Sequence, residues 1–529
     1  MRLIAENYDI GIAEPTALLH EDDCRILGIR EGDHVRIEGR GCVTAIASMS
    51  DTLVRRGTVM IACGVLGACC IRPGEEVEVT AAPIPESVRA IRGKMDGEEL
   101  SPEEISQIVD DAVHDRLSRI ETSAWLTALH IRGMSLRETA SYTSAMASTG
   151  SVLDFGDRRV FDFHSFGGVP GNKITPIVVS IVASEGLLIP KLSSRAISSA
   201  CGTADFVEVF CPVTHGSDDV RRITESEGGV FSWTGATDLA PAGDRFIRVQ
   251  RPLGIDPKPQ MLASIMAKKV AAGATDVLMD IPMGSETKVR SPEEAKAYAR
   301  DLMELGDLLG MRVECAVTYA DQPLGVAVGP APEARECIQV LENRPGHEEV
   351  AEKACICAGM ILEMAGMCDG TARAKECLTS GRALERFRAI VRAQGGMDGI
   401  SSEDIRMGSF SAEVLSPRDG FVNRISNKAV VAVAKAAGAP ADKGAGLVLS
   451  RKRGRKVAKG DVLMTVYSDS EDKLEDALEA AAELEPFDID GMLLDRIRPG
   501  SLRWDRLLRR GIELFKYSIH LARFIQLGE

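Results

Sequence analysis

A glycine-rich stretch at residues 162–175, DFHSFGGVPGNKIT, carries the residue types that bind an oxyanion. Its glycines expose backbone N–H groups where a strand expected at 159–163 runs into a helix expected at 175–185. Such a junction binds anions, because the free amides and the positive end of the helix point at the ligand. The spacing differs from a P-loop, since Lys173 is followed by Ile174 instead of a hydroxyl residue that would bind magnesium. A tight strand–helix turn that simply requires glycine is the alternative.

A second stretch, KLSSRAISSACGTADFVEVF at residues 191–210, concentrates hydroxyl groups and one guanidinium group. It follows an apolar segment that is typical of a buried strand. At this density, the hydroxyl groups and Arg195 can donate hydrogen bonds to the oxygens of a phosphorylated sugar. An ordinary serine-rich turn that ends in a helix cap is the alternative interpretation. The hydroxyl-bearing residues are Ser193, Ser194, Ser198, Ser199 and Thr203.

Chain length and charge limit the classes of function. With 529 residues the chain exceeds what one hydrophobic core can hold, so we expect several domains. A net charge of −15 would repel a nucleic-acid backbone, and 4% aromatic residues supply few stacking surfaces. We therefore expect no nucleic-acid partner. An anionic ligand must bind in a locally positive pocket lined by backbone amides.

The cysteine spacing and the hydropathy favour a cytoplasmic protein with no metal site. The chain has 13 cysteines but no C-x-x-C pair of the kind that binds zinc, and we expect buried free thiols. Acidic residues near the N-terminus differ from the basic region of a signal peptide. The longest uncharged apolar run, residues 59–71, has thirteen residues, below the roughly 18 that span a bilayer. We therefore expect no membrane association.

The periodicity of apolar residues predicts a multidomain α/β protein. Residues 1–84 alternate as short strands, and two related octapeptides, REGDHVRI and RPGEEVEV, predict a small β-barrel-like domain with an internal repeat. Gly32 and Gly74 would make the turn before each repeat strand. Ser101 and Pro102, followed by acids, predict the start of a helix. The expected domains are an N-terminal β domain (1–84), a helical domain (88–160), a central α/β domain (161–400), a C-terminal α+β domain (409–500) and a helical tail (501–529).

Three motifs in order resemble the thymidine and pyrimidine nucleoside phosphorylase family. Residues 193–208, SSRAISSACGTADFVE, resemble its signature; residues 164–168 resemble its phosphate loop, and residues 264–285 its next block. The GGVPGN form of the loop and the extra N-terminal β domain resemble the archaeal AMP phosphorylase branch. The likeness covers residues 88–500. It implies the class II nucleoside phosphorylase fold, in which the active site lies in a cleft between a helical domain and a larger α/β domain.

The resemblance implies a reaction that uses no cofactor and takes inorganic phosphate as co-substrate. AMP and phosphate would give free adenine and ribose 1,5-bisphosphate, with CMP and UMP also accepted, in nucleotide salvage. A cleft that closes would exclude water and so favour phosphorolysis over hydrolysis. The resemblance also implies a homodimer or a larger homo-oligomer.

The resemblance further assigns roles to individual residues. Asp256, in the segment GIDPKPQ, matches the proton donor to the leaving base, a role that requires burial to keep the carboxyl group neutral at pH 7. Because Pro257 follows it, Asp256 also suits a helix cap, which is the alternative. Lys288 is the expected cation for the 5′-phosphate, or else plain surface charge, and Arg195 would give two parallel donors to a phosphate. The residues expected to contact AMP or phosphate are Gly168, Ser194, Arg195, Ala196, Ile197, Ser198, Ser199, Thr203, Ser264 and Lys288.

Two positions depart from the family pattern. Cys201 stands where a glycine or alanine is usual, and Phe163 stands where relatives that act on nucleosides often carry a lysine. Loss of that charged donor would weaken phosphate binding unless Lys173 or Lys191 replaces it. His164 is interpreted as a hydrogen-bonded scaffold residue, although its position also suits a general base.

The sequence leaves other interpretations open. The basic run SRKRGRK at residues 450–456 resembles a nucleic-acid patch, but between two strands of an acidic protein we interpret it as a solvated hairpin. Two alternative functions are a thymidine or uridine phosphorylase and a non-catalytic nucleotide-binding assembly protein. Release of free base from AMP or from thymidine, in the presence of phosphate, distinguishes the three functions.

Overall fold

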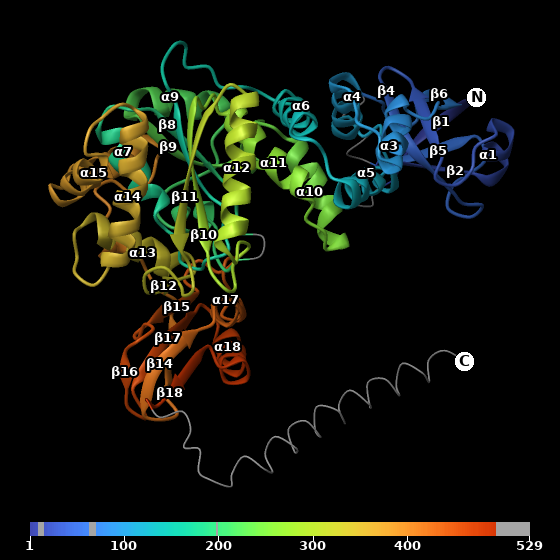
Figure 1. The fold of residues 1–529 in the computed structure, drawn as a ribbon. Helices are drawn as coiled ribbons and strands as arrows, with labels where there is room; N and C mark the ends of the chain where they lie inside the picture. The colour runs from blue at the N-terminus through green and yellow to red at the C-terminus, as the bar shows by residue number, and fades with distance from the viewer. Residues whose placement is uncertain (9–14, 63–69, 197–198, 493–529) are drawn as a thin grey trace, which may run out of the picture.

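The computed structural model describes residues 1–8, 15–62, 70–196 and 199–492. Along the chain, a β-barrel, a layer of helices, an α/β region and a smaller mixed unit follow one another (Figure 1). This arrangement confirms the multidomain α/β fold that the sequence predicts. The predicted helical tail at 501–529 lies outside the described residues. Within the described ranges, no helix combines the length and the apolar character needed to cross a bilayer.

The N-terminal strands close into a barrel with the order β1-β5-β2-β4-β3-β6. The two repeat strands, β3 and β6, pair antiparallel, with Ile37 opposite Val79 and both side chains fully buried. Gly32 and Gly74 have φ angles of 86° and 85°, which confirms the predicted turn before each repeat strand. The elements are β1 (Arg2–Tyr8), β2 (Thr16–Leu19), α1 (Glu21–Leu27), β3 (His34–Glu38), β4 (Cys42–Met49), β5 (Thr58–Ala62) and β6 (Glu76–Ala81).

Serine caps start three helices of the helical layer. The side chains of Ser101, Ser118 and Ser135 each accept a hydrogen bond from the backbone N–H three residues later. The glutamate at that later position accepts, with its side chain, a hydrogen bond from the backbone N–H of the serine. In the core of this layer, the indole of Trp125 donates to the hydroxyl of Tyr142 at 3.2 Å. The layer also includes two helices from later in the chain. Its helices are α3 (Glu86–Asp96), α4 (Pro102–Val113), α5 (Arg119–Arg132), α6 (Leu136–Ala147), α10 (Ala242–Leu253) and α11 (Lys258–Ala271).

Parallel strands form the centre of the α/β region. The strands are β7 (Phe161–Ser165), β8 (Ile189–Ser193), β9 (Gly229–Trp233), β10 (Asp276–Met283) and β11 (Arg312–Tyr319). β10 pairs with β7 and β11, β8 pairs with β9, and a bridge between Val160 and Leu188 joins the two groups. The chain therefore runs from β7 to β9 in one direction and returns to place β10 on the other side of β7. The carboxyl ends of β7 and β10 form the topological switch point, where sheets of this kind bind ligands.

Helices pack around this sheet and bury its apolar side chains. Phe161 and Phe163 of β7 belong to the largest core cluster of the α/β region, together with residues from most of the helices that follow. The helices are α7 (Thr175–Ser184), α8 (Thr203–Val207), α9 (Ser217–Glu227), α12 (Pro292–Leu308), α13 (Pro330–Leu341), α14 (Glu348–Met364), α15 (Gly370–Thr379) and α16 (Arg382–Ala393), with short turns η1 (Thr234–Ala236) and η2 (Ser402–Asp404).

Two small sheets and two helices form the C-terminal unit. One sheet has the order β12-β15-β17-β13 and the other β16-β14-β18. Strand β12 comes from the α/β region, so its pairing with β15 joins the two parts through backbone hydrogen bonds. The elements are β12 (Ala327–Val328), β13 (Phe410–Leu415), β14 (Gly420–Ile425), α17 (Asn427–Ala436), β15 (Gly446–Leu449), β16 (Lys456–Val457), β17 (Val462–Ser468), α18 (Glu471–Leu484) and β18 (Phe487–Asp490).

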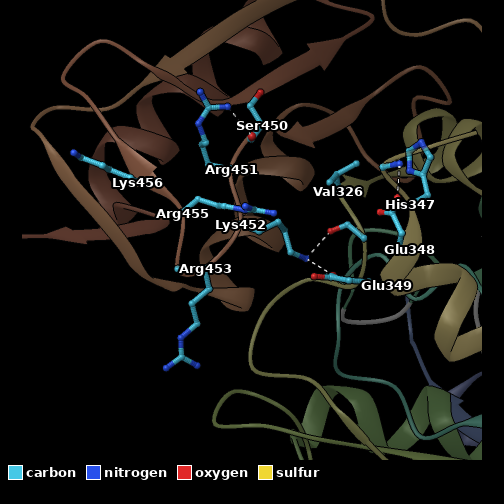
Figure 2. A pocket seen from close by; sticks show the side chains of 13 residues that line it. Val326, His347, Glu348, Glu349, Ser450, Arg451, Lys452, Arg453, Arg455 and Lys456 are labelled. Carbon is cyan, nitrogen blue, oxygen red and sulfur yellow. Dashed lines mark hydrogen bonds and ion pairs between the residues drawn. The ribbon is translucent and has the colours of Figure 1, made fainter.

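The basic run at residues 450–456 is wrongly predicted as a hairpin, because it connects β15 of one sheet to β16 of the other. Nor is all of it solvated. The Nζ atom of Lys452 donates to the carbonyl of Gly325 at 2.7 Å and pairs with Glu349 at 2.9 Å. The run lines a cavity of about 690 Å³ whose opposite wall carries His347 and Glu349 (Figure 2). Lys452 thus holds the C-terminal unit against the α/β region.

The cysteines only partly follow the prediction of buried thiols. All eleven cysteines in the described part of the chain are free. Six of them are buried, whereas Cys42, Cys70 and Cys368 are exposed.

Candidate active site

The loop after β7 touches the loop after β10 at the switch point. Gly168 has a φ angle of 93°, and a Cβ atom there would lie 3.3 Å from the backbone nitrogen of Lys288 and 3.4 Å from the Cα of Thr287. Gly171 has a φ angle of 74°, and its Cβ would lie 2.7 Å from the carbonyl oxygens of Leu324 and Ala327. Any larger residue would therefore push this loop off its neighbours. Gly168 and Gly171 are thus required by close packing as well as by the turn, whereas a Cβ at Gly167 would meet no atom within 4 Å.

Asp256 and Lys288, predicted separately, meet at this point. The Nζ atom of Lys288 lies 3.5 Å from Oδ2 of Asp256, and Gln250 donates to Oδ1 of Asp256 at 3.2 Å. The two charged side chains are 48% and 50% exposed. The carboxyl group is thus solvated in this structure, whereas the proton-donor role was expected to require burial. Its partner here is a cation.

The alternative interpretation of Asp256 as a helix cap is wrong. Helix α11 begins at Lys258 and its cap residue is Pro257, with no side-chain hydrogen bond at the cap. Asp256 lies one residue before the cap position, and its carboxylate accepts no hydrogen bond from the start of the helix. Its carboxyl group is left free to face Lys288.

The charges of four lysines act on the imidazole of His164, at the start of the predicted phosphate loop. The pKa of His164 lies well below its usual value, first because of burial and then because of the positive charges of these lysines. His164 is therefore neutral at pH 7 and can exchange hydrogen bonds without adding charge. Asp162, Asp244 and Asp256 pair with these lysines, so four cations face three acids, and the one positive charge left over favours an oxyanion. The four residues are Lys191, Lys268, Lys269 and Lys288.

A buried carboxylate beneath this group pairs with two of the lysines. Asp162 on β7 contacts Nζ of Lys269 at 2.6 Å and Nζ of Lys191 at 3.3 Å. All three side chains are at most 5% exposed. Burial lowers the pKa of Lys191 to about 8, although the charge of Asp162 opposes that shift. The sequence gives a weak signal for this arrangement, because Asp162 is a lone acid between two phenylalanines in an apolar strand.

The two lysines proposed to replace a missing donor at Phe163 are already bound. Lys191 donates to the Phe163 carbonyl at 2.6 Å. Lys173 is fully buried, pairs with Glu336 at 2.6 Å and donates to the Leu324 carbonyl at 3.0 Å. The side chain of Phe163 is fully buried in the core. Lys173 therefore supports the loop from below and is not available to a phosphate in this arrangement.

The loop after β8 is held by the acids that follow it. Both terminal nitrogens of Arg195 donate hydrogen bonds to Glu208, at 2.7 and 2.6 Å. The guanidinium group lies 4.7 Å from the centre of the Trp233 ring. The two parallel donors predicted for a phosphate thus bind a carboxylate here. Asp205 accepts hydrogen bonds from the backbone nitrogens of Ala196 at 2.7 Å and Gly202 at 2.9 Å. Sequence reasoning gave these two acids no role, although both belong to the quoted signature.

The remaining predicted contacts lie near these loops. Ser194 is exposed, the hydroxyl of Ser199 donates to the Cys201 carbonyl at 3.0 Å, and Thr203 is the first residue of α8. Two predicted residues, Ile197 and Ser198, lie outside the described residues.

Ser264 lies on α11, on the face that carries Lys268 one turn later. Its hydroxyl would lie 3.2 Å from a Cβ placed on Gly243 of α10, and Lys268 pairs with Asp244 at 3.4 Å. This face thus packs against α10, while the ammonium group of Lys268 also acts on His164.

Comparisons with known proteins agree with this arrangement. The helical bundle domain of a glycosyl transferase family matches residues 88–150, and the α/β domain of that family matches residues 157–384. The C-terminal domain of pyrimidine nucleoside phosphorylases matches residues 421–486. The fold and the site therefore define a pentosyl-transferring phosphorylase.

Curated relatives specify the family further. The AMP phosphorylase of Methanosarcina barkeri is 46% identical over 95% of this chain and 99% of its own. Those of Methanococcoides burtonii and Methanocaldococcus jannaschii are each 44% identical, over 94% and 92% of this chain and 99% and 97% of their own. The chain belongs to the AMP phosphorylase family. Anthranilate phosphoribosyltransferase from Thermus thermophilus aligns over 58% of this chain and 99% of its own, with 22% identity and a TM-score of 0.48, too weak a likeness to refine the assignment.

Replacing Asp162 tests the buried charges beneath the site. We expect Asp162→Ala to lower the free energy of unfolding by about 3–5 kcal/mol, because it leaves two buried ammonium groups without a counter-charge. Chemical denaturation of the full chain would measure this loss. Asp219→Ala, which removes an exposed carboxylate paired with Arg222 at 2.7 Å, is the matched control and should leave the midpoint nearly unchanged. Equal midpoints for the two variants would contradict the expectation.

Proposed function

We propose that this protein catalyses the phosphorolysis of AMP, giving free adenine and ribose 1,5-bisphosphate, and that it also accepts CMP and UMP. An oxygen of inorganic phosphate bonds to C1′ of the ribose as the bond from C1′ to the base breaks. Family membership supports the reaction. The single structural observation that carries it is the meeting of Gly168, Lys288 and Asp256 at the switch point of the sheet.

The attacking phosphate binds, in this proposal, beside the loop at residues 165–172. Backbone N–H groups of a glycine loop can donate to its oxygens, and the nearby lysines neutralise its charge. His164, kept neutral by burial and by those lysines, adds a hydrogen bond without repelling or trapping the nucleophile. Inorganic phosphate is the co-substrate, and no step requires a cofactor.

Lys288 would bind the 5′-phosphate of AMP, and this changes the surroundings of Asp256. The ammonium group now paired with Asp256 would turn to the phosphate, which also brings negative charge close to the carboxyl group. Both changes favour the protonated form of the Asp256 carboxyl group. A cleft that closes over the nucleotide would remove water and favour the protonated form further. Asp256 can then act as a general acid even though it is solvated in the ligand-free structure.

The protons of the reaction balance without a further acid or base. Protonated Asp256 gives its proton to a ring nitrogen of the departing adenine, so the base leaves neutral. The hydrogen phosphate ion loses its own proton as it becomes the ester at C1′. That proton restores the carboxyl group of Asp256, directly or through solvent.

Turnover of AMP by an Asp256 variant tests this proposal. With AMP and phosphate, the wild-type protein should release adenine, and omission of either substrate should abolish the release. Asp256→Asn should lower turnover by roughly 10²–10⁴-fold and leave AMP binding largely intact, because only the proton transfer is lost. Asp398→Asn removes a similarly exposed carboxylate, 3.3 Å from Arg392, and serves as the control. Base release from thymidine but not from AMP, or normal turnover by Asp256→Asn, would contradict the assignment.

The assignment of Lys288 to the 5′-phosphate is tested by comparing two ligands. Lys288→Ala should weaken binding of AMP by roughly 10-fold or more, as expected for loss of a charged hydrogen bond, and leave adenosine binding nearly unchanged. Calorimetric titration with each ligand measures the two affinities. Lys296→Ala, an exposed lysine on α12, is the control. An equal loss for AMP and adenosine would remove Lys288 from the phosphate subsite.

A further inference from the structure

Two described segments of the loop after β8, residues 194–196 and 199–202, are held by one side chain. Oδ2 of Asp205 accepts the backbone N–H of Ala196 at 2.7 Å and that of Gly202 at 2.9 Å. Asp205 is buried, and its other oxygen lies 3.4 Å from a terminal nitrogen of Arg195. The placement of these two segments therefore depends on where the segment that carries Asp205 is held.

Arg195 gives this loop a second attachment, to Glu208. Its two terminal nitrogens bind the two carboxylate oxygens of Glu208, so the guanidinium and the carboxylate lie in a fixed, bidentate geometry. These bonds, with a further contribution from Lys443, lower the pKa of Glu208 to about 2. Trp233 at the end of β9 covers one face of the guanidinium. The carboxylate of Glu208 is thus ionised and determines where Arg195 sits.

Glu208 is in turn held from another part of the molecule. Nζ of Lys443, in the C-terminal unit, lies 2.7 Å from Oε2 of Glu208 and donates to the backbone carbonyl of Asp205 at 3.4 Å. The backbone of Lys443 is itself fixed, because its carbonyl accepts the N–H of Ala331 at the start of α13 at 3.0 Å. The pairing of β12 with β15 holds the same junction. A lysine anchored on the C-terminal unit therefore reaches both acids that hold the loop.

We propose that Lys443 is a positioning residue for the loop segments 194–196 and 199–202 and that it acts through Glu208 on Arg195. With Arg195 alone, the carboxylate and the guanidinium could move together, and the loop with them. A second cation on a separately anchored segment pins the carboxylate, and hence the loop, against the α/β region. The inference rests on the proposed function where it assigns this loop to AMP.

A stabilising role alone would not require this arrangement. The side chains of Arg195, Glu208 and Lys443 are 34%, 28% and 39% exposed, and ion pairs that exposed contribute little to overall stability. Ligand affinity responds to loop placement in a different way. If the binding loop is correctly placed for only a fraction of the time, the apparent affinity for the ligand falls by that fraction. The effect of Lys443 should therefore appear in AMP affinity and not in unfolding.

Steady-state kinetics of Lys443 variants test the effect on the nucleotide. Lys443→Ala should raise the KM for AMP roughly 3- to 10-fold, with kcat within 2-fold of wild type and the KM for phosphate unchanged, since only ground-state placement of the loop is lost. Lys443→Arg should restore most of the affinity. Lys473→Ala is the matched control, because Lys473 forms a 2.6 Å ion pair with Asp442 in the same unit. An unchanged KM for AMP in Lys443→Ala, or an equal rise in the control, overturns the role in nucleotide binding.

Hydrogen exchange tests loop placement without reference to activity. The backbone amides of Ala196 and Gly202 should exchange severalfold faster in ligand-free Lys443→Ala than in wild type, and at the wild-type rate in Lys473→Ala. Wild-type exchange at both amides in Lys443→Ala overturns the positioning role. A wild-type protein that does not release adenine from AMP would instead contradict the proposed function, and the exchange rates would still decide this inference.

Discussion

The site depends on one buried carboxylate that binds two ammonium groups. Asp162 joins β7 to Lys191 on β8 and to Lys269 on α11, the elements that carry the phosphate loop, the serine-rich loop and Ser264. A buried charge without a partner costs several kcal/mol, so the three elements are held in the one arrangement that satisfies all three charges. The positive charge of the trio, after burial, lowers the pKa of the His164 imidazole and favours an oxyanion nearby.

An ion pair between a lysine and a glutamate also supports each of the two loops proposed to bind substrate. Lys173 and Glu336 form a fully buried pair below the predicted phosphate loop, and His347 donates to the carboxylate of Glu336 at 3.0 Å. Lys443 and Glu208 support the loop after β8 from the C-terminal unit. Asp256 and Lys288, the parts expected to meet substrate, are by contrast half exposed and, within the described part of the chain, pair with each other and with Gln250. Buried ion pairs thus hold the loops in place, while the exposed pair of Asp256 and Lys288 can separate so that Lys288 binds an anion.

Local signals predicted much of the fold, and their failures have local reasons too. Serine caps, repeat strands and glycine turns act within a few residues, so Ser101, Gly32 and Gly74 behave as predicted. The cap at Asp256 failed by one residue, because Pro257 takes the cap position and the helix starts after it. The prediction of a hairpin at 450–456 is wrong, because sequence alone does not show that the flanking strands belong to different sheets.

The sequence by itself determined most of the elements and their order, and it predicts two loops that bind a phosphorylated sugar, because turns, caps and amphipathic periodicity are set by neighbouring residues. Only the tertiary structure decided which charges meet. It pairs Lys288 with Asp256, Asp162 with Lys269, and Lys443 with Glu208, partners that are far apart in the chain. A charged side chain can pair with any opposite charge that the fold brings within about 4 Å, and burial then sets the strength of that pair. Arg195 shows the consequence, since a residue type suited to phosphate is bound here to a carboxylate.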